Sequence, residues 1–147
     1  MFVTAALCVS SLLLAADPVS QEKQPAAAQT KLLAAQTDLL PIEENIVQYT
    51  NYERARYGLP ALQVARELMD TARQHTNWMA FSQAFTHSNY PVAENIAMGQ
   101  PDSQDVVQCW MNSPGHRANI LGGYTRIGVA AYRTPSGTIY WCQQFSQ

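Results

Sequence analysis

Basic residues are scarce in this chain, and they do not cluster. The 147 residues include 9 Lys and Arg against 11 Asp and Glu, which gives a net charge of −2 at pH 7 and a pI of about 5.8. A protein that binds nucleic acid or an anionic membrane through charge needs a basic patch. The composition therefore predicts no nucleic-acid partner and no partner that is attracted mainly by charge.

Long apolar runs are also missing. The apolar segment at residues 1–16 is shorter than the roughly 20 residues that a membrane helix needs. It ends in small residues, which is typical of a secretory signal peptide and its cleavage site. No Lys or Arg precedes it, and the first basic residue is Lys23. We interpret it as a signal-like segment of a secreted or extracytoplasmic protein, whose mature chain has no transmembrane span. A leader without a targeting role is the alternative.

Residues 17–40 are rich in Ala, Gln, Pro and Thr and poor in aromatic residues. Such a segment cannot bury enough apolar surface to fold alone, so we expect a linker. Leucines near its end approach helical spacing. From the sequence, this part can be a short helix that packs on the domain or a frayed segment. Residues 41–147 are long enough for one domain with its own core. We expect this domain to be a monomer.

The first helix of the domain is expected to begin at Pro41, which suits a first helical position. Its apolar positions, spaced at i, i+4 and i+7, are Ile42, Ile46 and Tyr49. Glu53 and Arg56 follow where this stripe predicts apolar residues. We favour a salt bridge between them on a solvated last turn, with Glu53 as a spare acid near the site.

Two further helices follow from apolar periodicity. The stripe of the second consists of Ala65, Leu68, Met69, Ala72, Thr76 and Met79. His75 lies at its margin, and we interpret it as a hydrogen-bonded boundary residue. The third helix is capped by Asp102 or Ser103. Its buried face is expected to contain Val106, Val107 and Trp110.

The C-terminal part has the pattern of a β-hairpin. Apolar residues alternate from Ile127 to Ala131, and residues 134–137 read Thr-Pro-Ser-Gly, which favours a turn. Residues 138–145 are rich in β-branched and aromatic side chains. Residues 95–98 are a candidate for a further strand. Helices and a small antiparallel sheet along one chain predict the α+β class.

Residues 110–121 read W-M-N-S-P-G-H-R-A-N-I-L and predict a short helix around His116. Ser113 is a suitable N-cap and Pro114 a suitable first helical residue. His116 then lies in the first turn, where the positive end of the helix dipole favours a neutral imidazole. A neutral ring binds metals and accepts protons. Ile120 shares its face and anchors the turn to the core.

Four sequence blocks together carry a resemblance to a known family. They are N-Y-E-R-A-R-Y-G-L-P-A-L at residues 51–62, F-T-H-S at 85–88 followed by A-E-N-I at 93–96, residues 110–121, and I-G-V-A-A-Y at 127–132 followed by Y-W-C-Q-Q-F at 140–145. In this order the blocks resemble the CAP superfamily, which groups cysteine-rich secretory proteins, antigen 5 and pathogenesis-related protein 1. The resemblance is closest to its bacterial branch. It implies an α-β-α sandwich over residues 42–145 and a secreted or cell-envelope protein.

His87, Glu94 and His116 are the candidate metal ligands. Two histidines and a carboxylate suit zinc or another divalent cation, although no H-E-x-x-H or C-x-x-C spacing supports a site on its own. The resemblance implies a cleft with two histidines and two acids, and these three positions match it. The second acid is missing, because Ser113 stands where many eukaryotic members have Glu.

Other groups are candidates for the site. Water, Asn112 or Glu53 would replace the missing acid. We expect Tyr90, in the loop between the predicted ligands His87 and Glu94, to form a wall or lid of the cleft. Ser113 and Asn112 are expected at the same cleft.

Three functions are open. The one we favour is a non-enzymatic CAP domain whose cleft binds a divalent metal or a small apolar, lipid-like ligand. In it, Glu94 orients a histidine or caps the strand at 95–98. The second is a metal-dependent hydrolase with Glu94 as general base, and it is weaker because no Ser or Cys nucleophile stands beside a base. The third is a purely structural module of the cell envelope.

The three cysteines fit an exported protein. If Cys8 leaves with the signal-like segment, Cys109 and Cys142 remain as an even pair. A disulfide would join the third helix to the last strand and contribute roughly 3 to 4 kcal/mol in the chain-entropy model. Two buried free thiols are the alternative, because Cys is often a small core residue. Both stay open from the sequence.

Overall fold

The computed structural model describes residues 39–147. The signal-like segment and residues 17–38 of the linker lie outside these residues. In chain order the elements are α2 (Pro41–Arg56), β1 (Gln63–Val64), α3 (Arg66–Ser82), β2 (Ala93–Met98), α4 (Ser103–Asn112), α5 (Pro114–Ile120), β3 (Arg126–Arg133) and β4 (Ile139–Ser146). In this part of the chain, no helix is long and apolar enough to cross a bilayer.

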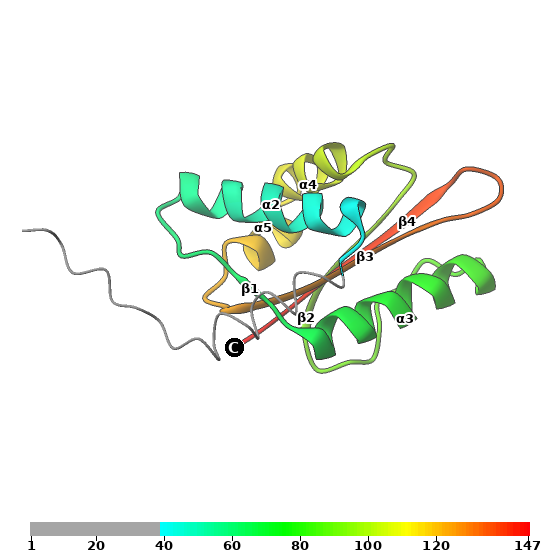
Figure 1. Ribbon diagram of the computed structural model, residues 1–147, viewed down its shortest axis with the longest axis horizontal. Helices are drawn as coiled ribbons and strands as arrows, with labels where there is room; N and C mark the ends of the chain where they lie inside the picture. The colour runs from blue at the N-terminus through cyan, green and yellow to red at the C-terminus, as the bar shows by residue number, and fades with distance from the viewer. Residues whose placement is uncertain (1–38) are drawn as a thin grey trace, which may run out of the picture.

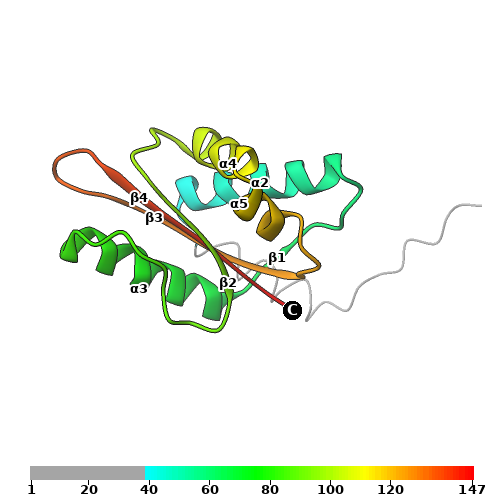
Figure 2. The same cartoon turned by 180° about the vertical axis from the view of Figure 1, so that it is seen from behind.

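The four strands form one sheet between two layers of helices. Their order is β1-β3-β4-β2, with β3 antiparallel to β4 and β4 antiparallel to β2. Helix α3 covers one face of the sheet, and α2, α4 and α5 cover the other (Figures 1 and 2). The expected α+β class, the α-β-α sandwich, the hairpin and the third antiparallel strand are confirmed. The two-residue strand β1 pairs parallel with β3, so the sheet is mixed.

The alternation of strand side chains divides the core into two parts. On the side of α2 and α4, the sheet contributes Ile127, Val129, Trp141 and Phe145. On the side of α3 it contributes Ile96, Ala130, Tyr140 and Cys142. Gly128 also faces α3, and a Cβ on it would lie 2.1 Å from the backbone carbon of Leu68. Helix α3 therefore packs directly on the backbone of β3.

Helix α2 begins at Pro41 as predicted, and Ile42 and Ile46 of the predicted stripe pack in or against the core, but Tyr49 does not. The buried residues are Glu43, Ile46, Thr50 and Arg54, whereas Tyr49 is 36% exposed. Two of them are charged and are paired inside the protein, which an apolar pattern does not detect. Glu43 accepts two hydrogen bonds from Arg73 on α3, at 2.9 and 2.6 Å. The predicted pairing of Glu53 with Arg56 is confirmed at 3.0 Å.

Arg54 is buried, with 1% of its surface exposed. Its guanidinium donates to four backbone carbonyls, those of Pro60, Ile120, Gly122 and Tyr124, at 2.9, 2.8, 2.8 and 3.3 Å. Burial lowers the pKa of Arg54 below its ordinary value. One side chain of α2 therefore holds the end of α5 and the loop that leads into β3.

The other helices follow the sequence pattern closely. The predicted faces of α3 and α4 are buried, and Asp102 caps α4 by accepting from the amides of Gln104 and Asp105. Ser113 occupies the predicted N-cap position of α5, but its side chain makes no capping hydrogen bond. Ser113 ends α4 and begins α5 at once, and its backbone N–H donates to Trp110 instead. The capping role expected for its hydroxyl is therefore wrong.

The disulfide alternative is also wrong, because Cys109 and Cys142 are both free thiols. Cys109 is exposed on α4, whereas Cys142 is buried on the face of β4 that contacts α3. The sheet thus separates the two sulfur atoms. The free-thiol alternative holds, with Cys109 exposed rather than buried.

Candidate functional site

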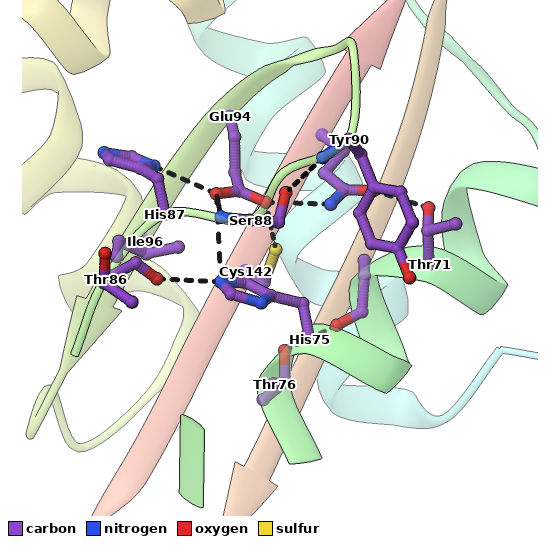
Figure 3. Close-up of polar contacts among 12 residues, drawn as sticks. Thr71, His75, Thr76, Thr86, His87, Ser88, Tyr90, Glu94, Ile96 and Cys142 are labelled. Atoms are coloured by element: carbon purple, nitrogen blue, oxygen red, sulfur yellow. Dashed lines mark hydrogen bonds and ion pairs between the residues drawn. The ribbon is translucent and has the colours of Figure 1, made fainter. Parts of the chain in front are cut away.

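The buried carboxylate of Glu94, on the edge strand β2, is the centre of the site. Its Oε1 accepts hydrogen bonds from His87 Nδ1 and from the backbone N–H of Ser88, both at 2.9 Å. Its Oε2 accepts from Gln144 Nε2 at 2.8 Å, and the Cys142 thiol lies 3.7 Å away as a weaker donor. Figure 3 shows His87, Ser88 and Cys142 around this carboxylate.

This environment keeps Glu94 ionised. Burial acts to raise the pKa of Glu94, but the hydrogen bonds from Gln144, Ser88 and His87 outweigh it and lower the pKa below its ordinary value of 4.5. Conversely, burial and then the Glu94 charge raise the pKa of the Cys142 thiol well above its usual range, so it stays protonated. A saturated, weakly basic carboxylate is poorly suited to general-base catalysis.

His87 lies at the surface, with its side chain 58% exposed. Because the ionised Glu94 only accepts hydrogen bonds, the Nδ1 of His87 carries the proton. In the neutral ring, Nε2 then keeps its lone pair. A histidine that is oriented by a carboxylate through one nitrogen, with the other nitrogen available, is the usual form of a metal-binding histidine.

His116 lies in the first turn of α5, as predicted. Burial, and then the nearby charge of His87, lower the pKa of His116 below its ordinary value of 6.5. The pKa of His116 is therefore shifted in the expected direction, toward a neutral ring. The causes of the shift are burial and His87 rather than the helix dipole. The Nδ1 of His116 is buried and has no hydrogen-bond partner among residues 39–147.

Two asparagines fasten α5 to β2. Asn95 Nδ2 donates to the carbonyl of His116, and Asn119 Nδ2 donates to the carbonyl of Glu94 and to Asn95 Oδ1. The backbone around His116 is thereby held beside the strand that carries Glu94. The sequence analysis missed this role, although both residues belong to the blocks that carry the family resemblance.

His75 is a second histidine near the Glu94 carboxylate, and the sequence analysis did not place it there. Its Nε2 lies 2.9 Å from the carbonyl of Thr86 and 3.9 Å from Glu94 Oε1. The predicted hydrogen bond is confirmed, but His75 is buried rather than at the boundary. Its proximity to Glu94 results from the packing of α3 on the sheet, for which the sequence contains no local signal.

A cavity of about 510 Å³ lies between α3 and the loop that follows His87. Its lining comes from α3 (Gln74, His75, Trp78) and from the loop (His87, Ser88, Asn89, Tyr90). Tyr90 is thus part of its wall, and its hydroxyl donates to Gln74 Oε1 at 3.1 Å. Asn112, Ser113 and His116 are outside this lining, and their role in a cleft stays a prediction.

A second depression, of about 530 Å³, lies between α2 and α4. Its walls include Tyr49, Tyr52 and Val107, and its rim carries Gln48, Glu53, Gln104 and Gln108. It is lined by different residues from the cavity beside His87. Glu53, the spare acid of the sequence analysis, therefore belongs to this groove.

The donor set fits a divalent cation only in part. No group of three or more His, Cys, Asp and Glu side chains within residues 39–147 is arranged to hold a metal ion. Both oxygens of Glu94 are engaged, so Glu94 is an orienting group rather than a free ligand. The imidazoles of His87 and His116 remain as nitrogen donors, and the unpaired His116 Nδ1 is the kind of atom that a ligand satisfies.

His116 should make stability depend on pH. Because its pKa in the folded protein is below 6.5, the unfolded chain binds this proton first as the pH falls. The contribution of His116 to the free energy of unfolding is therefore expected to be fully present above pH 6.5. It decreases as the pH falls from 6.5 toward the pKa that His116 has in the folded protein. Glu94 adds a second decrease below pH 4.5, where its unfolded form protonates. Urea unfolding midpoints across this range, compared with those of His116→Gln, measure the first decrease. An equal slope in the variant would contradict this assignment.

The family model of the cysteine-rich secretory proteins (CAP) matches residues 47–145. The chain belongs to the CAP family. The protein YkwD of Bacillus subtilis is 36% identical over 151 aligned positions, which cover 89% of this chain and 58% of YkwD. The membrane protein YlbC of the same organism is 28% identical, over 70% of this chain and 34% of YlbC. This CAP chain thus spans less than two thirds of either relative.

Solved CAP structures have the same fold. An extracellular SCP-domain protein of Bacillus anthracis superposes with a TM-score of 0.64 and 26% identity, over 74% of this chain and 44% of that one. An outer surface protein of Borrelia burgdorferi gives a TM-score of 0.63 at 18% identity, over 74% of this chain and 96% of that one. At that identity, the second match supports the fold alone.

Proposed function

We propose that this chain is an extracellular, non-enzymatic CAP domain that binds a divalent cation of the zinc type through His87 and His116. The observation that carries the proposal is the hydrogen bond between Glu94 Oε1 and His87 Nδ1, at 2.9 Å. It fixes the ring and the tautomer that a metal ligand needs. The neutral His116, with its unpaired Nδ1, provides the second nitrogen.

The extracellular assignment has two supports. The sequence begins with a signal-like segment, and the matching B. anthracis protein is described as extracellular. Cysteine pairing does not contribute, because Cys109 and Cys142 are free.

The hydrolase alternative is less well supported by the geometry. A zinc hydrolase needs a base that accepts a proton from metal-bound water. Glu94 is engaged at both oxygens, and Glu53 is paired with Arg56 and lies in the other groove. Two imidazoles are fewer protein ligands than the three of a typical catalytic zinc site, which favours weak, reversible binding.

Calorimetric titration of the chain with zinc tests the proposal. We expect binding in the micromolar range that disappears in His87→Ala and in His116→Ala. The matched control is His75→Gln, which changes a nearby histidine that is bonded to Thr86. Absence of heat with a folded wild type, or binding that survives both histidine variants, would overturn the metal proposal. Folding of each variant is checked by circular dichroism.

A small apolar ligand is a second candidate, because the groove between α2 and α4 has aromatic and aliphatic walls. The polyene fatty acid cis-parinaric acid becomes fluorescent in such a site. We propose that it binds here, and that Tyr52→Asp removes the signal. Tyr57→Asp is the control, because Tyr57 is exposed on the next turn and is not part of the groove wall. Equal binding by both variants would reject this groove.

A further inference from the structure

The cavity beside His87 contains an exposed tryptophan. Trp78 is 48% exposed, whereas Trp110 and Trp141, the other two tryptophans of the chain, are fully buried. The indole stacks on the ring of buried His75, with centroids 5.7 Å apart and planes inclined by 13°. Trp78 is therefore a flat apolar surface that is supported from the protein side and open to solvent.

Polar residues make up most of the remaining lining of this cavity. Gln74 and Asn89 contribute side-chain amides, and Ser88 and Tyr90 contribute hydroxyls. The loop is held in place, because Glu94 accepts the N–H of Ser88 and Gln74 accepts the hydroxyl of Tyr90. The oxygen of Gln74 is used in this contact, which leaves its NH₂ group to donate to a ligand. Such a preformed site loses little conformational entropy on binding.

The lining contains no Lys, Arg, Asp or Glu among the described residues. The lining therefore offers no fixed positive charge to bind a phosphorylated or sulfated ligand, and it offers no carboxylate to bind a cationic ligand. The complementary ligand is neutral, has one flat apolar face and carries many hydroxyl or amide groups. These are the properties of a pyranose ring, whose axial C–H groups stack on aromatic rings while its hydroxyls form hydrogen bonds.

We propose that this cavity binds a neutral saccharide, with one pyranose ring stacked on the exposed part of Trp78. The volume of about 510 Å³ lies within the roughly 300 to 1,000 Å³ of small-molecule sites. His87 lines the cavity and also belongs to the metal site proposed above, whereas His116 does not line the cavity. The two proposed sites therefore share His87, and a change at His116 affects the metal site alone.

Tryptophan fluorescence provides a direct test, because Trp78 is the only one of the three tryptophans that is exposed. Titration with chitotetraose is expected to shift the emission and to protect it from acrylamide quenching. Trp78→Ala removes the fluorescent side chain, so the binding of chitotetraose to this variant is measured by calorimetry. We expect its affinity for chitotetraose to be about tenfold lower than that of the wild type. Gln74→Ala keeps the reporter and is expected to weaken binding as well.

Three comparisons make the test decisive. Phe81→Ala, which changes an exposed aromatic residue one turn further along α3, should bind chitotetraose like the wild type. His116→Ala should lose zinc and keep the saccharide, which separates this proposal from the metal site. Absence of chitotetraose binding by a folded wild type, equal affinity of Trp78→Ala, or preferential binding of adenosine would overturn the proposal.

Discussion

Replacing Glu94 with glutamine is expected to lower the free energy of unfolding by about 2 to 3 kcal/mol and the affinity for zinc about 10- to 100-fold. Glutamine has nearly the same shape, but one of its two terminal atoms is an NH₂ donor. If this NH₂ group faces Gln144, the Gln144 amide must turn over and lose the hydrogen bond that its oxygen accepts from Thr71. If it faces His87 Nδ1 and the Ser88 amide, it meets two donors. The ring of His87 then loses its fixed orientation.

Urea unfolding and zinc calorimetry on the same preparation measure the two effects of Glu94→Gln. Glu53→Gln is the matched control, because its carboxylate is paired with Arg56 near the surface of α2. We expect it to leave stability and zinc binding unchanged within experimental error. Unchanged zinc affinity in a destabilised Glu94→Gln variant would assign Glu94 a purely structural role. A hydrolytic activity that depends on Glu94 would instead favour the enzyme hypothesis.

The part of the site that the sequence predicted is the part that has characteristic local chemistry. His87, Glu94 and His116 were selected because they are residue types that bind metals and because they lie in the family blocks. Their role as metal ligands stays a prediction. The partners of Glu94 were not found. Gln144 stands in a strand that reads as hydrophobic, and its function depends on the register that places it opposite Glu94. Register between distant strands is set by the whole sheet.

The choice among the roles considered for Glu94 depends on the fold for the same reason. As an isolated residue it is a candidate ligand, a candidate base or a support that orients a histidine, and the sequence analysis considered all three. Its saturation by donors from β4 and from the loop after His87 makes it an orienting group. The number of donors around a carboxylate is a property of tertiary packing. Whether Glu94 acts as a ligand, a base or a support can therefore be decided only once the fold is known.

The fold was predicted more fully, because helical and strand periodicities are local. The faces of α3 and α4 and the alternation of β3 agree with the structure. Helix α2 is the exception, since its buried face includes Glu43 and Arg54. Periodicity identifies apolar faces, and a charged residue whose partners lie on another element is invisible to it. Tyr49 was assigned to the buried face because it follows Ile42 and Ile46 at helical spacing, but its side chain is 36% exposed.

Replacing Arg54 with methionine is expected to lower the free energy of unfolding by about 3 to 5 kcal/mol, although methionine is apolar and of similar length. The four carbonyls that Arg54 binds would lose their donor inside the protein. Ile120 and Gly122 lie where α5 ends, so this end should loosen first. Hydrogen exchange is expected to show faster exchange of the amides in residues 114–122, and zinc affinity should fall because His116 belongs to this segment.

Arg54→Lys separates charge from geometry. An ammonium group keeps the charge, but its three N–H donors share one nitrogen and cannot reach four carbonyls that surround a planar guanidinium. We expect it to recover only a part of the lost stability. Arg56→Met, two residues along the same helix, changes an arginine whose side chain is 58% exposed and should behave like the wild type. Full recovery by lysine would show that charge alone is required here. Recovery limited to a fraction means that α2 holds α5, and with it His116, through the shape of this side chain.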